Sequence, residues 1–164
     1  MAKKKKKSTR KKSNVQAAPQ HNLPSGFWPQ VGAVLLVVLS LLLVIAWFNV
    51  GGPVLEWINN STQQLIGYSM YILPILLVYV AVEIFRAEEN RLSWMLKFSV
   101  LIEIIWFSGL FGLLKSDSHP EAGGLIGDLT NTAMLGLVDS AIAAFIYVLL
   151  IFITALVITQ TLPF

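Results

Sequence analysis

The chain has 164 residues, of which 55% are hydrophobic and only 13% are charged, and its mean hydropathy is +0.69. These values lie outside the range of ordinary soluble domains and indicate one membrane-embedded domain. The absence of cysteine excludes a disulfide framework and thiolate metal sites. The formal net charge of +3 does not describe a basic domain, because the first twelve residues alone carry eight cations.

Residues 1–26 are rich in Lys, Ser, Gln, Asn and Pro and offer almost nothing apolar to bury. We predict a disordered, basic, cytoplasmic tail. Its cations can lie on anionic lipid headgroups, each contributing about 1 kcal/mol near the surface. Contact with nucleic-acid phosphates is the alternative, but an apolar span follows directly and favours the lipid interpretation. The cations are Lys3, Lys4, Lys5, Lys6, Lys7, Arg10, Lys11 and Lys12.

Four long apolar stretches follow the tail, and we predict a membrane-spanning helix for each. The first contains eighteen uncharged residues, which at 1.5 Å per residue give about 27 Å, close to the hydrocarbon thickness. No A-x-A site follows it, which favours a retained anchor over a cleaved signal peptide. In the second stretch Pro74 lies near the middle and is expected to bend the helix. The spans are expected at about 31–48, 65–85, 92–114 and 137–162, within one four-helix domain covering 27–164.

The distribution of Lys and Arg between the loops predicts how the chain is oriented. Eleven of the twelve cations lie in the tail or in the stretch 86–97, which joins the second span to the start of the third and carries Arg86, Arg91 and Lys97. The other two connections together carry only Lys115. Because cytoplasmic loops are enriched in Lys and Arg, we expect both termini in the cytoplasm.

The two outer connections have the pattern of short amphipathic helices. One begins at Pro53 and the other at Gly124, and each has apolar residues on one helical side and polar residues on the other. We expect both to lie in the outer membrane interface; the alternative is that each merely extends a span. Paired glycines precede or open both segments and would ease the turn there. Stretches 51–59 and 123–131 also align weakly, which suggests two similar hairpin units. The aligned glycines and the one that follows them are Gly51, Gly52, Gly123, Gly124 and Gly127.

Three stretches carry a resemblance to a known family. They are the basic tail, the segment Gly52-Pro53-Val54 with Trp57-Ile58 and Gly67-Tyr68-Ser69-Met70-Tyr71-Ile72-Leu73-Pro74-Ile75-Leu76-Leu77-Val78-Tyr79, and Gly123-Gly124-Leu125-Ile126-Gly127. Together they resemble the four-helix membrane domain at the N-terminus of FtsK/SpoIIIE-type bacterial DNA translocases.

The resemblance implies a non-catalytic module that anchors a translocase in the bacterial plasma (inner) membrane at the division septum and helps it assemble. It also implies a homo-oligomer, contacts with division-septum proteins, and a role in chromosome segregation. In that family a hexameric ATPase motor pumps the DNA, so DNA contact would require a motor that the residues up to Phe164 do not include. They contain no G-x-x-x-x-G-K-[ST]; the stretch 109–116 has the wrong spacing. We therefore expect no catalysis and no cofactor.

Glu103 is the strongest candidate for a functional polar residue, because it lies at the centre of the third span. An ionised carboxylate costs several kcal/mol at that depth, so we expect Glu103 to face the bundle interior. The functional interpretation is a small proton- or ion-coupled transporter or channel. The favoured interpretation is structural: a neutral Glu103 hydrogen-bonded to Tyr68, Tyr71 or Ser99, or across an oligomer interface.

Other residues are interpreted as structural. Glu83 is expected to pair with Arg86 three residues later. Ser108 and Gly112 are small residues four apart, a spacing that permits close approach of helices. His119, the one histidine in the outer loops, is expected to be solvated and to hold no metal.

Overall fold

The computed structural model describes residues 27–48, 50–86 and 94–160. These ranges contain helices and no strands, which confirms the expected all-α class. The tail at 1–26, for which disorder was predicted, lies outside the described residues. The elements are α1 (Phe27–Ala46), α2 (Pro53–Ile66), the 3-10 helix η1 (Gly67–Tyr71), α3 (Leu73–Arg86), α4 (Trp94–Gly112), α5 (Gly124–Leu135) and α6 (Ser140–Gln160).

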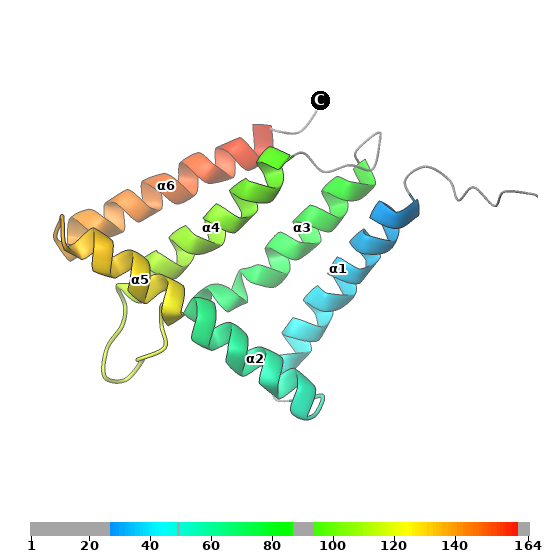
Figure 1. Ribbon diagram of the computed structural model, residues 1–164, viewed down its shortest axis with the longest axis horizontal. Helices are drawn as coiled ribbons and strands as arrows, with labels where there is room; N and C mark the ends of the chain where they lie inside the picture. Colours follow the sequence, from blue (N-terminus) through cyan, green and yellow to red (C-terminus); the bar gives the residue numbers. More distant parts are fainter. Residues whose placement is uncertain (1–26, 49, 87–93, 161–164) are drawn as a thin grey trace, which may run out of the picture.

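The four longest apolar segments stand in one layer, in the order α1, α3, α4, α6 (Figure 1). Helix α1 packs along α3, and α4 packs along α6. The short helices α2 and α5 cross the same end of the layer and meet there. The chain therefore forms two units, α1–α2–α3 and α4–α5–α6, each a helical hairpin with a short helix at its tip. This arrangement agrees with the weak alignment of stretches 51–59 and 123–131, which suggested two similar hairpin units.

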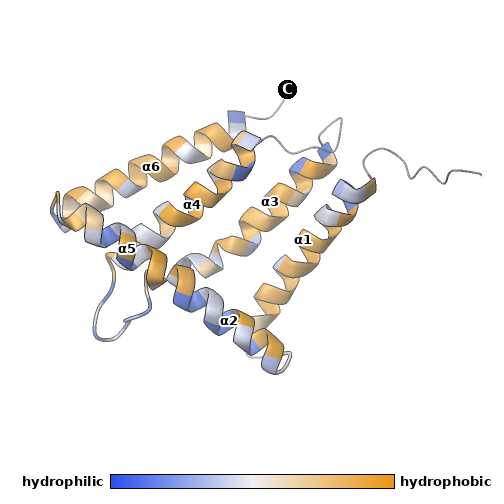
Figure 2. Ribbon diagram, in the orientation of Figure 1, coloured by the Kyte–Doolittle hydropathy of each residue, from blue (hydrophilic) through white to orange (hydrophobic). Residues whose placement is uncertain are grey.

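Three helices are long and apolar enough to cross a membrane: α1, α4 and α6. A fourth span results if α2–η1 and α3, which are bent by 75° relative to each other, count as one. The fourteen residues of α3 give about 21 Å and the five of η1 about 10 Å, so together they reach the hydrocarbon thickness. Figure 2 shows the span helices apolar almost all round, whereas polar and apolar residues alternate on α2.

The expected second span, 65–85, is bent near its middle, but by a break between η1 and α3 and not by a kink of one continuous helix at Pro74. Pro74 is the second residue of α3, in the first helical turn, where a missing N–H leaves no hydrogen bond unmade. The change of direction lies instead at η1, which separates α2 from α3. The Pro74 carbonyl accepts a 3.0 Å hydrogen bond from Ser40 Oγ and so ties α3 to α1.

Small side chains allow the helices to approach closely. Ala33, Ala46, Ala81 and Ala143 are all at most 1% exposed. In lipid there is no hydrophobic drive between helices, so such close van der Waals contact is what holds them together. Many of the large apolar side chains instead point outward from the spans, as a hydrocarbon environment permits.

The two units also touch through larger side chains between α3, α4 and α6. Leu96, Val100 and Ile158 form a buried cluster, and residues of α3 pack against it. Tyr79 of α3 donates a 3.3 Å hydrogen bond to the Ile158 carbonyl of α6. The expected pair of Glu83 with Arg86 is present, at 3.7 Å.

Candidate functional site

The two units meet most closely where η1 abuts the start of α5. Gly67 and Gly124 both have positive φ, +58° and +61°, which favours glycine. A Cβ on Gly124 would lie 2.5 Å from the Gly67 nitrogen, and one on Gly67 would overlap the Ala122 carbonyl. The Tyr68 N–H donates a 2.9 Å hydrogen bond to that same carbonyl. Two backbones are therefore in direct contact here.

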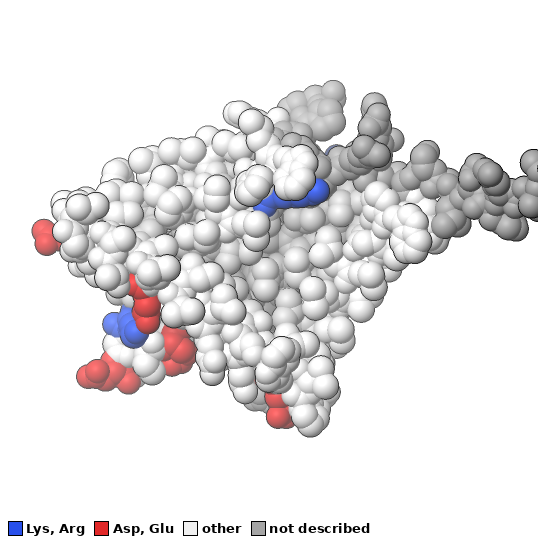
Figure 3. Space-filling model, in the orientation of Figure 1, with Lys and Arg blue, Asp and Glu red and all other residues white. Residues whose placement is uncertain are grey.

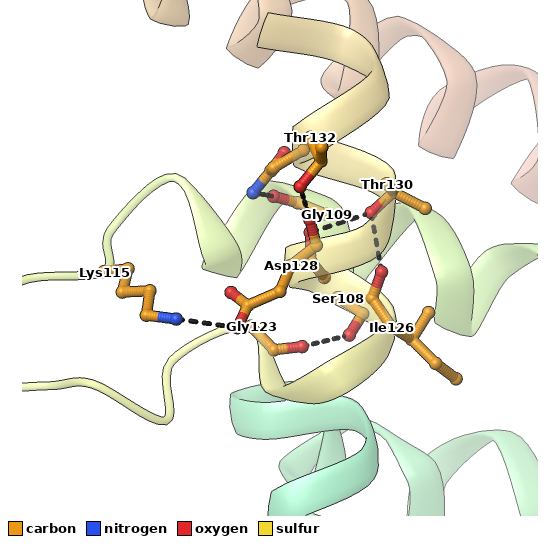
Figure 4. A network of polar contacts seen from close by, with 10 residues as sticks. Ser108, Gly109, Lys115, Gly123, Ile126, Asp128, Thr130 and Thr132 are labelled. Atoms are coloured by element: carbon orange, nitrogen blue, oxygen red, sulfur yellow. Dashed lines mark hydrogen bonds and ion pairs between the residues drawn. The ribbon is translucent and has the colours of Figure 1, made fainter.

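Ser108 of α4 lies at the centre of this contact and is fully buried. Its hydroxyl is 2.6 Å from the Gly123 carbonyl oxygen (Figure 4). It is also 3.0 Å from the carbonyl oxygen of Ile66. A hydroxyl has one proton, which the two acceptors share or exchange. Because Ile66 is the last residue of α2, its carbonyl has no partner within that helix. Ser108 thus joins the end of α2 and the start of α5 to α4.

Glycine also lets α4 and α5 approach each other closely. A Cβ on Gly123 would lie 2.5 Å from Gly112 Cα, and one on Gly127 would overlap the Ser108 carbonyl. We call the whole contact region the glycine junction. It comprises Gly67, Ser108, Gly109, Gly112, Gly123, Gly124, Gly127, Asn131 and Tyr147.

A buried polar chain extends the glycine junction to α6. Asn131 Nδ2 donates to the Gly109 carbonyl at 3.0 Å, and Tyr147 OH donates to Asn131 Oδ1 at 2.9 Å. Both side chains are almost completely buried. A Cβ on Gly109 would lie 2.6 Å from the Tyr147 ring, so this glycine makes room for the tyrosine. Each buried polar group here has a partner, as stability in an apolar environment requires.

The two glycine pairs that align in the sequence have different structural roles. Gly51 and Gly52 have φ of +115° and +80° and turn the chain into α2, but a Cβ on Gly52 would meet nothing within 4 Å. Gly123 has an ordinary φ of −95° and is needed for space, not for conformation. The expected turn-easing role is therefore supported for the first pair and for Gly124, whose φ is +61°. The second pair serves mainly close packing.

The loop before α5 is held by exposed polar contacts. Lys115 Nζ lies 2.6 Å from Asp128 Oδ2, and Tyr68 OH lies 2.9 Å from His119 Nδ1. Figure 3 shows acidic side chains gathered at this end of the molecule, with a basic side chain among them. Within the described ranges no three His, Cys, Asp or Glu side chains are grouped to hold a metal.

Glu103 is 4% exposed, so the expectation that it faces the interior is confirmed. Among the described residues it forms no hydrogen bond with Tyr68, Tyr71 or Ser99, and the expected alternative, a bond across an oligomer interface, stays a prediction. Its Oε2 has no partner among the described residues. Tyr68 OH bonds His119 instead, and the Tyr71 ring packs on Trp47 with centroids 5.0 Å apart. Both tyrosines belong to η1, near the end of the layer, whereas Glu103 lies at the middle of α4.

Sequence reasoning singled out five residues of the glycine junction but neither their contacts nor the other four members, Gly67, Gly109, Asn131 and Tyr147. The spacing of Ser108 and Gly112 predicted close helix approach in general, and both residues are indeed in contact with α5 or its N-cap. Gly67, Asn131 and Tyr147 had no distinguishing local pattern. An Asn and a Tyr on neighbouring helices of an apolar chain are the one signal that would have pointed to the hydrogen-bonded pair.

These features define a multi-pass, all-helical membrane module whose halves are joined by backbone contact. A family model described as the 4TM region of DNA translocase FtsK/SpoIIIE matches residues 47–162. Because the match covers well over half of the chain, the chain belongs to this family, which confirms the resemblance. The matched region is the membrane-anchor part of such translocases and is not itself catalytic. No curated protein and no solved structure matches the chain.

Replacing Gly127 by Ala should destabilise the fold, because the new Cβ would overlap the Ser108 carbonyl. The cost expected for such overpacking is about 1–3 kcal/mol. The matched control is Gly32→Ala in α1, where a Cβ would meet nothing within 4 Å. Thermal unfolding in detergent, followed by circular dichroism, measures both variants. Equal midpoints for the two variants would contradict the close contact.

Proposed function

We propose that the chain is the membrane-anchoring and assembly module of an FtsK-like DNA translocase that acts in cell division and chromosome segregation. The observation that carries this proposal is the family match over residues 47–162. The architecture supports it, since three to four candidate spans are joined by direct backbone contact. A rigid joint of this kind suits an anchor that must withstand the pull of a motor.

The exposed faces of the layer support self-association, which we also propose. Helices α1 and α6 form its two edges (Figure 1), and each carries large apolar side chains on its outer face. Leu35 and Leu41 of α1 are 62% and 58% exposed, and Phe145 and Phe152 of α6 are 70% and 61% exposed. Such surfaces contact either lipid or other helices. Division-septum proteins are the further partners that the family implies.

Localisation tests the proposed role directly. We expect this chain, fused to a fluorescent protein and to the linker and motor of an FtsK-type translocase lacking its own membrane domain, to concentrate at the septum and to restore division. An unrelated four-span domain on the same motor is the control for membrane attachment alone. Uniform membrane fluorescence from a folded fusion, with division not restored, would refute the role at the septum.

We propose that both termini are cytoplasmic and that α2 and α5 lie on the opposite side of the membrane. The separation of charge supports this orientation. Arg86 and Lys97 lie near the ends of α3 and α4 that face away from α2 and α5, whereas Glu56 and Asp128 lie on those short helices. Cations are retained on the cytoplasmic side.

Cysteine labelling tests this orientation, because the chain has no cysteine and every one introduced is unique. Gln63→Cys on α2 should react with a membrane-impermeant maleimide added outside spheroplasts. The matched variant Arg86→Cys, at the end of α3, should react only after the membrane is permeabilised. Reaction in the reverse order would invert the proposed topology.

A second candidate function, a proton- or ion-coupled transporter or channel, rests on one observation, the buried Glu103 whose Oε2 lacks a partner. Transport sites combine broken helices with several converging polar groups. Here the bend between α2 and α3 lies at η1, and the polar groups of the glycine junction are bonded to one another. The anchor is therefore favoured.

Replacing Glu103 by Gln distinguishes the two functions. For the anchor, neither the native chain nor Glu103→Gln should carry proton-dependent flux in proteoliposomes, and both should support septal localisation equally. Glu56→Gln on α2, where the side chain is exposed, is the matched control. Flux by the native chain that Glu103→Gln abolishes and Glu56→Gln preserves would establish the transporter instead.

A further inference from the structure

A groove of about 600 Å³ lies between α2 and α4. Helices α3 and α5 contribute to its wall with one residue each, Leu73 and Ile126. Trp57 and Leu65 line it from α2, and Leu101 and Ile104 line it from α4. The groove exists because the glycine junction holds the C-terminal end of α2 against α4, while the 75° bend directs the rest of α2 away from α3.

The lining of the groove is suited to hydrocarbon. Nine of its eleven residues are apolar, and the other two are Ser61 and Thr62. The Thr62 hydroxyl donates a 2.7 Å hydrogen bond to the Ile58 carbonyl, so its proton is already used. A polar ligand would therefore lose its hydration and find few partners in return.

The groove opens among side chains that face the membrane. Leu101 is 59% exposed and Trp57 is 70% exposed, and both belong to the lining itself. Ile75, in the first turn of α3, is also 68% exposed. A groove in such a surface is filled from the bilayer and not from water. Its occupant is then either an acyl chain or a helix of another protein.

The size of the groove favours an acyl chain over a helix. A helix with a diameter of about 10 Å and a pitch of 5.4 Å occupies about 420 Å³ per turn, so the groove would admit little more than one turn. A helix crossing the membrane has several turns, so most of it would lie outside the groove. An acyl chain is thin and flexible and can follow the groove beneath α2.

The charges at the end of the layer that α2 and α5 cross distinguish between headgroups. In the part of the chain that the structure describes, α2, α5 and the loops at their end of the layer carry Glu56, Asp117, Glu121, Asp128 and Asp139, against Lys115. Lys115 is already paired with Asp128. This surface repels anionic headgroups and attracts the amine of a zwitterionic one.

We propose that the groove between α2 and α4 binds one acyl chain of a zwitterionic phospholipid from the leaflet that α2 and α5 occupy. Its amine lies near the acidic end of the layer and its acyl chain lies against Leu101 and Ile104. The bound lipid fills the space that the bend between α2 and α3 leaves open. This inference depends on the candidate spans and not on the proposed role in division.

Native mass spectrometry of the whole chain tests the proposal. The chain is reconstituted in vesicles of equimolar phosphatidylethanolamine and phosphatidylglycerol and then extracted in mild detergent. We expect one retained phospholipid per chain, with phosphatidylethanolamine enriched about fivefold, as one charge at the surface would produce. Retention of no lipid, or a preference for phosphatidylglycerol, would overturn the proposal.

A matched pair of variants on α4 localises the bound lipid. Ile104→Trp places a larger side chain in the groove and should abolish lipid retention, whereas Ile102→Trp lies outside the lining and should leave it unchanged. Should Ile104→Trp fail to fold, Ser61→Phe fills the groove from α2 and should give the same loss. Equal retention by a folded groove variant and by Ile102→Trp would overturn the proposal.

A single cysteine tests the other occupant, a second copy of the chain. Ser61→Cys places the only thiol of the protein in the lining of the groove. With a lipid in place, membranes carrying this variant should form no disulfide-linked dimer under an oxidant. An efficient Ser61→Cys dimer would show that a second copy occupies the groove and would refute lipid binding there.

Discussion

The contact of Ser108 with the backbone of Gly123 and the end of α2 is the interaction on which the rest of the structure depends. Helices in lipid gain no hydrophobic energy by meeting, so close packing and hydrogen bonds must hold them. At the glycine junction both are present, because Gly112, Gly123 and Gly127 have no side chain to separate α4 from α5. Without the glycine junction the two hairpin units would be held together mainly by the side chains between α3, α4 and α6.

Other features follow from this joint. Because the last carbonyl of α2 is bonded to Ser108, α2 ends against α4, and the groove forms beside it. The same joint leaves α1 and α6 as the free edges of a single layer, so their apolar faces remain available for lipid or for further copies. Glu103 lies in the middle of α4, away from these bonded groups, and its carboxyl is left without a partner at Oε2. The proposed anchoring, lipid contact and self-association would thus use different surfaces of one molecule.

Much of the fold was predictable, and the errors have physical reasons. The expected first, third and fourth spans lie within a few residues of α1, α4 and α6, because a long apolar run is compatible with few structures other than a membrane-crossing helix. The second span was expected from residue 65, but Leu65 and Ile66 belong to α2, and hydropathy alone does not distinguish the end of an amphipathic helix from the start of a span. The bend expected at Pro74 lies two residues earlier, where η1 gives way to α3, and Pro74 occupies the first turn of the new helix. For Glu103, burial was predictable from its depth, whereas its partners depended on where η1 lies relative to α4.

By itself, the sequence indicated that this chain is helical and that glycines mark the start of both short helices, and it predicted four membrane-crossing segments, of which the structure supports three to four candidates. These properties depend on residues that are close together in the sequence, so local composition and periodicity are sufficient to indicate them. Only the tertiary structure decided which glycines are needed for space, which carbonyls Ser108 bonds, and that Asn131 links Gly109 to Tyr147. The Ser108 contacts join residues 15 and 42 positions apart, and proximity over such separations arises from the packing of whole helices.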